Sequence, residues 1–137
     1  MSYVDHVGDL YEVDDTMDSI VIPIVEHTFR GGRSLNVTGY PEPVIKAGHV
    51  IIMQDSNEEC KPMPLIISEE TNKPIGYDSL PAGHSYIGLL RASILRSKAF
   101  AAIVTAGQAN PAVLPFSLEP IIEDFIEAVP LIEFKED

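Results

Sequence analysis

The sequence predicts a mainly β (α+β) fold, a compact β-barrel-like or β-tulip-like domain with one short amphipathic helix near its carboxyl end. Eleven prolines and nine glycines are spread over 137 residues, which favours short strands joined by turns. Two apolar runs, at 86–90 and 100–104, have the length of buried strands. Only residues 118–129 repeat apolar side chains at helical spacing.

Residues 82–110 are predicted to form the centre of the fold. A polar link, 91–98, joins the two apolar runs, and Gly83, Gly88 and Gly107 punctuate the stretch. Glycine inside a strand usually marks a tight bend, a bulge or a close backbone approach, which indicates a curved, barrel-like or sandwich-like body. The stretch contains no obvious catalytic side chain.

Residues 1–19 are predicted to be an acidic, flexible arm, and residues 20–137 a single β-rich domain. Six acidic residues lie between 2 and 19, and no lysine or arginine occurs before Arg30. Charges of one sign repel each other and bury little surface, so this segment should be mobile by itself. Its apolar residues could dock onto a partner, and a solvated tail is the alternative. The candidate docking residues are Tyr3, Val4, Val7, Leu10, Tyr11 and Val13.

Shorter strands are predicted along the rest of the chain. Residues 20–25 form an apolar run broken by a proline, which is typical of an edge strand. The Gly-Gly centre of 30–33 indicates a turn, and 49–53 is a strong strand. Residues 61–67 resemble a strand interrupted by two prolines.

The clearest periodic element is 118–129, where apolar residues fall at i, i+3, i+4, i+7, i+8 and i+11 and acidic residues occupy the other face. Ser117 is placed to cap this helix, and Pro120 is tolerable because it lies in the first turn. Pro130 should end the helix. Alternation of apolar and charged residues then predicts a final strand at 132–135.

Composition excludes several classes of partner. Nine basic and twenty-one acidic residues give a formal net charge of −12, which disfavours nucleic acid and anionic membranes. The amino terminus lacks the basic start of a signal peptide, and the apolar runs are too short for a membrane span, so we expect a soluble protein made in a reducing compartment. The single cysteine, Cys60, cannot form an intrachain disulfide and is expected to be a free structural thiol.

The sequence contains no strong catalytic or metal-binding motif. None of the four histidines has the local spacing of a metal site, and the serines lack a nucleophile elbow. We therefore predict no enzyme activity, no cofactor and no metal. The alternative function is a small-molecule or metal-binding β-barrel, with an enzyme as one form of it, because His49 and His84 each follow an Ala-Gly pair and could converge at a barrel mouth.

Several of these pieces, in this order, resemble the lambda-type head decoration proteins of tailed bacteriophages. The similarity covers residues 44–134 and depends on the order and spacing of short motifs. Those motifs are IKAGHVI at 45–51, CKPMPL at 60–65, YIGLLRASI at 86–94, FAAIVTAGQAN at 100–110, the helix at 118–129, and PLIEF at 130–134.

The resemblance implies a structural virion protein that sits as a homotrimer on the outer capsid surface. Its partners would be itself and the major capsid protein, bound largely through the amino-terminal arm, and it would brace the head against internal DNA pressure. It would be made in the cytoplasm of the bacterial host. Deleting residues 2–19 should then leave the fold and trimer intact but weaken capsid binding.

Three features depart from the family's pattern. Arg91 and Arg96 are basic where the family often has acidic residues. The loop at 68–81 is long, and the region before residue 43 is longer than the usual arm and contains a strand signal of its own. A related head-fibre base that carries other material is therefore a second possibility within the same resemblance.

Overall fold

The structure is a computed structural model that describes residues 2–6, 9–13, 18–29 and 31–135. Its first strands are β1 Ser2–His6, β2 Asp9–Val13, β3 Ile24–Thr28, β4 Arg33–Ser34, β5 Val44–Ile45, β6 Val50–Gln54 and β7 Cys60–Pro62. The later strands are β8 Leu65–Ile67, β9 Pro74–Tyr77, β10 His84–Leu90, β11 Ile94–Leu95, β12 Phe100–Ala101, β13 Ile103–Ala109 and β14 Ile132–Phe134. The α-helices are α1 Asp18–Val21 and α2 Ile122–Ala128, and short 3-10 helices occupy Arg96–Lys98 and Pro111–Val113. Neither α-helix is long and apolar enough to cross a membrane.

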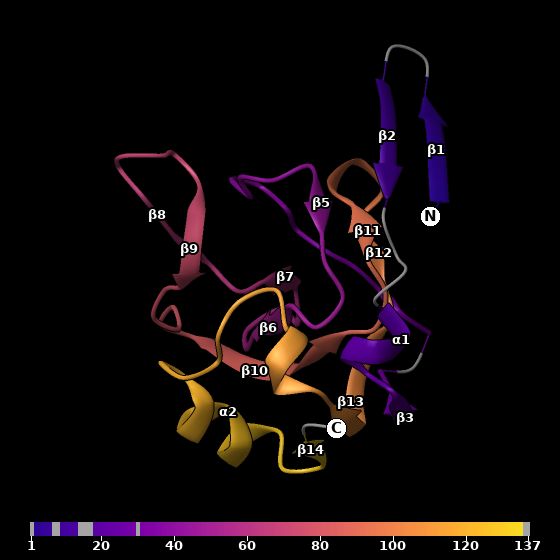
Figure 1. Ribbon diagram of the computed structural model, residues 1–137. Coiled ribbons are helices and arrows are strands. Elements are labelled where there is room, and N and C mark those ends of the chain that lie inside the picture. The colour runs from indigo at the N-terminus through magenta and orange to yellow at the C-terminus, as the bar shows by residue number, and fades with distance from the viewer. Residues whose placement is uncertain (1, 7–8, 14–17, 30, 136–137) are drawn as a thin grey trace.

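The body is built around one six-stranded sheet (Figure 1). Its strand order is β14-β13-β10-β6-β7, and a sixth strand, β3, branches from this order by pairing with β13. Strands from the two central apolar runs pair in antiparallel register, with Leu89 opposite Val104 and Leu90 opposite Ile103. The predicted buried strand at 100–104 is divided, because Phe100 and Ala101 form β12, which pairs with β4, and Phe100 is 62% exposed. β6 is antiparallel to both β10 and β7. The final strand, β14, pairs with β13 in parallel, and within it Ile132 is buried while Glu133 is exposed.

The central strands are buried on both faces, which explains their continuous apolar sequences. In β6, Val50 and Ile52 pack into one cluster and Ile51 into the other. The larger cluster contains Phe125 of α2. The smaller one contains Ile45 of β5, and so the short strands form the opposite cover of the sheet.

The mainly β fold with a short helix near the carboxyl end is confirmed. The barrel-like closure is not found, because none of the sheets formed by the described residues closes on itself. Proline gives a physical reason: it cannot donate a backbone hydrogen bond, and Pro62 and Pro64 lie where β7 ends the sheet. The chain then leaves the sheet, and β8 pairs with β9 alone.

Gly88 lies at an irregularity in the pairing of β10 with β6, where the register shifts between Tyr86 and Gly88. A Cβ atom at this position would overlap the carbonyl oxygen of Val104 on the neighbouring strand. The predicted close approach of backbones is therefore present at this glycine.

We expect the Gly88→Ala variant to lose about 3 kcal/mol of unfolding free energy, because the added methyl group forces β10 and β13 apart. Urea denaturation measures the loss. Gly76→Ala is the matched control, since Gly76 also lies in a strand but has open space where a Cβ would stand. Equal unfolding midpoints for the two variants would contradict the steric explanation.

The carboxyl-terminal helix is shorter than predicted. It begins at Ile122, after a turn in which the backbone N–H of Ile121 donates to the Leu118 carbonyl oxygen at 2.8 Å, and Pro120 disfavours helical geometry at Glu119. The Ser117 hydroxyl oxygen accepts from the backbone N–H of Glu119 at 3.2 Å and so supports the preceding turn instead of capping the helix. Ile126, predicted on the apolar face, is 46% exposed. The buried residues of this region are Leu118, Ile121, Phe125 and Val129.

The apolar run at 20–25 is divided between two elements. Its first residues belong to α1, which ends at Val21, and strand β3 starts at Ile24, directly after Pro23. β3 pairs only with β13 among the described strands, so the predicted edge position is present. The first residues of this run are helical, whereas a strand was predicted there. Val21 and Ile22 are buried in the larger cluster.

Candidate docking surfaces

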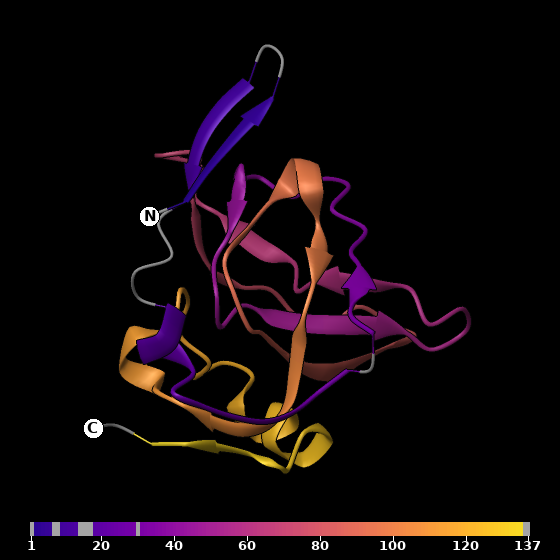
Figure 2. The same cartoon turned by 90° about the vertical axis from the view of Figure 1, so that its right-hand side faces the viewer.

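The amino-terminal arm pairs with itself. β1 and β2 are antiparallel, with Ser2 opposite Val13 and His6 opposite Asp9, and this hairpin projects away from the body in both views (Figures 1 and 2). The prediction of a mobile segment did not anticipate this pairing. A two-stranded hairpin by itself is only marginally stable in water. Of the candidate docking residues, Tyr3, Val4, Leu10, Tyr11 and Val13 lie in these strands, and Val7 lies outside the described residues.

The body of the domain begins at Asp18. The two carboxylate oxygens of Asp18 accept from the backbone N–H and the hydroxyl of Ser93, both at 2.8 Å. The Ser93 hydroxyl oxygen in turn accepts from the N–H of Ala47 at 3.0 Å. The predicted arm boundary at residue 19 therefore falls inside α1, beyond a residue that is already bonded to the body.

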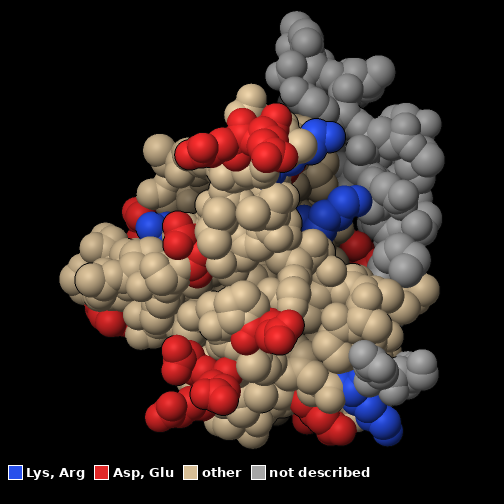
Figure 3. Space-filling view, turned by 60° about the vertical axis from the view of Figure 1, so that its left-hand side comes forward, with Lys and Arg blue, Asp and Glu red and all other residues tan. Residues whose placement is uncertain are grey.

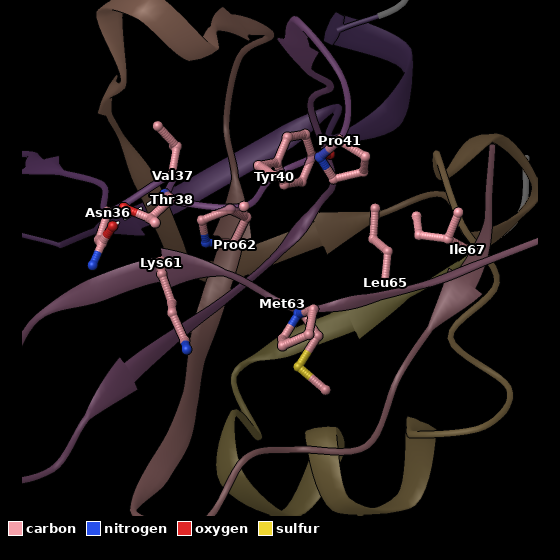
Figure 4. Close-up of a pocket in the computed structure, with 12 residues that line it drawn as sticks. Asn36, Val37, Thr38, Tyr40, Pro41, Lys61, Pro62, Met63, Leu65 and Ile67 are labelled. Atoms are coloured by element: carbon pink, nitrogen blue, oxygen red, sulfur yellow. Dashed lines mark hydrogen bonds between the residues drawn. The ribbon is translucent and has the colours of Figure 1, made fainter. Parts of the chain in front are cut away.

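A groove lies between the segment 36–41 and the strands that follow Cys60 (Figure 4). Its volume is about 180 Å³. In the close-up, Leu65 and Ile67 lie across the gap from Tyr40 and Pro41. Prolines 62 and 64 also line it and stiffen its walls, because proline restricts the backbone. The groove is thus a preformed, mainly apolar surface.

The charges beside this groove have both signs, and Glu42 is close enough to Tyr40 to help raise the pKa of its hydroxyl, after the larger effect of burial. Lys61 is the charged residue among those that line it. A second hollow, of about 480 Å³, shares Tyr40 with the groove and is lined by Arg96, which donates from Nη1 to the Tyr40 carbonyl oxygen at 2.7 Å. Glu59 stands at the rim, where it accepts a hydrogen bond from Asn36 at 2.8 Å. The groove therefore combines apolar walls with nearby charges of both signs.

The β8–β9 hairpin exposes apolar surface that the sequence analysis missed. Ile66, Ile67 and Ile75 are 45%, 41% and 66% exposed, on a sheet of two strands only. Its turn carries the exposed acidic residues Glu69 and Glu70. The sequence does place isoleucines on both sides of an acidic turn, a pattern that indicates an exposed apolar hairpin. Two strands of three or four residues cannot cover each other's apolar side chains.

Figure 3 shows the face that carries β8–β9 and α2. Acidic side chains form separate groups on this face, with uncharged surface between them. The formal net charge of −12 is therefore not spread evenly. Uncharged surface between acidic groups can approach another anionic protein with less repulsion than the acidic groups themselves.

The structure separates the two histidines of the alternative hypothesis. The backbone N–H of Leu90 donates to the His49 carbonyl oxygen at 2.9 Å, whereas His84 pairs with Gln54 at the other end of the same two strands. Extended chain of that length spans about 20 Å. The described residues also contain no group of three or more His, Cys, Asp or Glu side chains that could hold a metal ion. The predicted convergence of His49 and His84 is therefore wrong.

His49 is instead fully buried inside an aromatic cage. Its ring meets those of Tyr40, Tyr77 and Phe116 edge-on, at centroid distances of 5.5, 5.3 and 5.8 Å. The Nδ1–H donates to the Val50 carbonyl oxygen at 2.9 Å, so Nε2 is unprotonated, and it has no hydrogen-bond partner among the described atoms. Burial lowers the pKa of His49 to about 4, against the smaller opposing effect of the Val50 hydrogen bond.

Cys60 is a buried free thiol at the start of β7. Its sulfur makes a weak contact of 3.8 Å with the Glu58 carbonyl oxygen. Burial raises the pKa of the thiol, and the resulting protonated form is a poor nucleophile. These observations agree with a structural cysteine.

Searches of protein-family models, curated proteins and solved structures found no match to this chain. The evidence on its function therefore comes from its own surfaces.

Proposed function

We propose that this chain is a structural virion protein, without enzymatic activity, that binds the outside of a phage capsid as a homotrimer and stabilises the head. The observation that carries the proposal is the β1–β2 hairpin, which projects beyond the body and pairs with no other described strand. Because such a hairpin is marginal alone, docking against a larger surface would stabilise it. The major capsid protein is the proposed partner.

The chemistry of the arm supports docking onto a protein surface. It combines acidic residues with apolar ones, and contacts made by the apolar residues can offset the entropy lost when the arm is fixed. The proposed docking residues are Tyr3, Val4, Val7, Leu10, Tyr11 and Val13.

The body is suited to a bracing role. Its central sheet is packed on both faces, and Cys60 is a free thiol, so the body is held together by packing and not by a disulfide. If the trimer binds the intact shell more tightly than the disassembled one, its binding stabilises the intact shell by mass action. Three arms on one trimer would also bind with higher avidity than one arm alone.

Deleting residues 2–17 should abolish co-sedimentation with shells assembled from the major capsid protein of the same phage. The deletion stops before Asp18 to keep its bonds to Ser93. The urea midpoint should match that of the full chain, because the hairpin pairs with no other strand among the described residues.

A matched pair of arm variants separates apolar docking from charge. Replacing Val4, Leu10 and Tyr11 with serine should weaken shell binding about as much as the deletion does. Replacing Asp5 and Asp9 with asparagine should weaken it less, because exposed charges contribute little to affinity compared with buried apolar side chains. Undiminished shell binding by the truncated protein would overturn the proposal.

A further inference from the structure

We propose that residues 114–117 form a strap that is closed over His49 at neutral pH and opens when the ring of His49 takes up a proton. The strap joins the 3-10 helix Pro111–Val113 to the turn before α2. It contributes Phe116, whose ring meets that of His49 edge-on at a centroid distance of 5.8 Å. The strap belongs to the body of the domain, so its opening is independent of the arm and of shell binding.

The closed cage has room for one ring proton on His49 but not for two. The side chain is fully buried, and its Nδ1–H already donates to the Val50 carbonyl oxygen at 2.9 Å. Nε2 has no hydrogen-bond partner among the described atoms. A second proton would therefore put an unpaired donor and a positive charge into an apolar interior, which is costly. An arrangement that exposes the ring to water accepts the proton more readily.

The side chains that face the ring carry no charge that could hold the second proton. They come from three elements and are Tyr40 of segment 36–41, Tyr77 of β9 and Phe116 of the strap. Burial raises the pKa of both tyrosine hydroxyls, with a smaller contribution from Glu42 at Tyr40, so both stay neutral in acid. β10 contributes the backbone N–H of Leu90, which donates to the His49 carbonyl oxygen.

The strap is the wall of the cage that is held least firmly. Its backbone, at 114–117, makes no hydrogen bond with another described residue. By contrast, the Tyr77 hydroxyl oxygen accepts from the backbone N–H of Val50 at 3.1 Å. The Tyr40 carbonyl oxygen accepts from Nη1 of Arg96 at 2.7 Å. Side-chain packing alone keeps the strap in place, so it is the wall that should move first.

Both ends of the strap are fixed, so it can swing without the rest of the body unfolding. Before it, the N–H of Asn110 donates to the Val21 carbonyl oxygen at 2.8 Å. After it, Leu118 is buried, and its carbonyl oxygen accepts from the N–H of Ile121 at 2.8 Å. Pro115 of the strap also lines a hollow of about 230 Å³, so one side of the strap is not packed against the body.

Acid should favour the open form by a calculable factor. Burial holds the pKa of His49 at about 4 in the closed form, whereas the ordinary value of 6.5 applies to an exposed ring. Because the open form binds the proton more tightly, the ratio of open to closed molecules rises about thirtyfold between pH 8 and pH 5. Amide hydrogen exchange detects such a form even when it is rare.

The exchange rate of the Val50 amide tests the opening. This N–H lies inside the cage, bonded to the Tyr77 hydroxyl, so water reaches it when a wall of the cage moves. We expect its rate, divided by that of an unstructured peptide at the same pH, to rise about thirtyfold from pH 8 to pH 5. Low concentrations of urea should hardly change this rate, because opening the strap exposes little surface, whereas amides in the middle of β13 should respond strongly. In the His49→Gln variant the rise should disappear, because glutamine does not titrate.

A matched pair of phenylalanine variants tests the strap itself. In Phe116→Ala, the pKa of His49, followed by the NMR signals of its ring, should rise from about 4 towards 6.5, because water then enters the cage. Phe100→Ala is the control, since it removes a ring that is 62% exposed on β12. This control should leave the pKa of His49 at about 4.

Several outcomes overturn the inference. An equal Val50 rate at pH 8 and pH 5, or a rise that persists in His49→Gln, removes His49 as the trigger. A urea dependence as strong at Val50 as in β13 shows that global unfolding, and not the strap, admits the proton. The same pKa of His49 in both phenylalanine variants shows that the strap does not exclude water. If a variant does not fold, the urea comparison on the unmodified chain decides by itself.

Discussion

Replacing Phe125 with alanine is expected to lower the free energy of unfolding by about 4 kcal/mol, the loss typical of a buried phenylalanine. Phe125 is fully buried between α2 and the central sheet. Its ring lies 5.7 Å from the ring of Tyr86 and 5.9 Å from that of Phe134, measured between centroids. Alanine would leave a cavity that the backbone of the packed sheet cannot close.

Urea denaturation at neutral pH measures this loss. Ile126→Ala is the control, because Ile126 is the next residue of α2 and is 46% exposed. It should cost less than about 1 kcal/mol, as surface changes usually do. Small domains have a total stability of about 5–15 kcal/mol, so the Phe125→Ala variant should lose a large share of it. Similar losses in both variants would show that α2 does not seal the core.

Acid should destabilise the fold through His49. The folded-state pKa of His49 is about 4, below the ordinary value of 6.5, because its ring is buried. Between these two pH values the unfolded chain binds a proton that the folded chain does not. The contribution of the neutral, buried His49 to the free energy of unfolding is therefore fully present above pH 6.5, and it is lost as the pH falls towards 4. At 1.36 kcal/mol for each unit of pKa shift, His49 alone accounts for about 3 kcal/mol of that loss.

The His49→Gln variant isolates this contribution, because glutamine does not titrate. Unfolding free energies of the variant should fall by about 3 kcal/mol less than those of the unmodified chain between pH 6.5 and 4. His27→Gln is the control, since it also removes a histidine, but one that is exposed on β3. Parallel pH profiles for all three proteins would contradict a buried neutral His49.

Local signals in the sequence predicted the central elements well. The apolar runs around Leu89 and Val104 are paired strands, and Gly88 is a close backbone approach. These features depend on side chains that are near each other along the chain. The periodicity predicts a helix from Leu118, whereas a turn closed by the Ile121 N–H and the Leu118 carbonyl oxygen precedes α2 in the structure.

The candidate sites were predicted less well, because each depends on residues far apart in sequence. His49 and His84 follow the same Ala-Gly pair, yet antiparallel pairing of β6 with β10 puts them at opposite ends. The groove joins segments separated by about twenty residues, and no local pattern marks it. The exposure of Ile66, Ile67 and Ile75 followed only from the finding that β8 and β9 form a sheet of their own.

By itself, the sequence determined that this is a mainly β chain with a carboxyl-terminal amphipathic helix, an acidic amino terminus and glycines at points of close approach. Periodicity, charge and backbone freedom are properties of neighbouring residues, and they can be read without a fold. Only the tertiary structure decided that His49 is caged, that Asp18 belongs to the body, and that an apolar groove lies beside Lys61. Those features arise from strand pairing and packing between distant segments, which set the burial and the neighbours of each side chain.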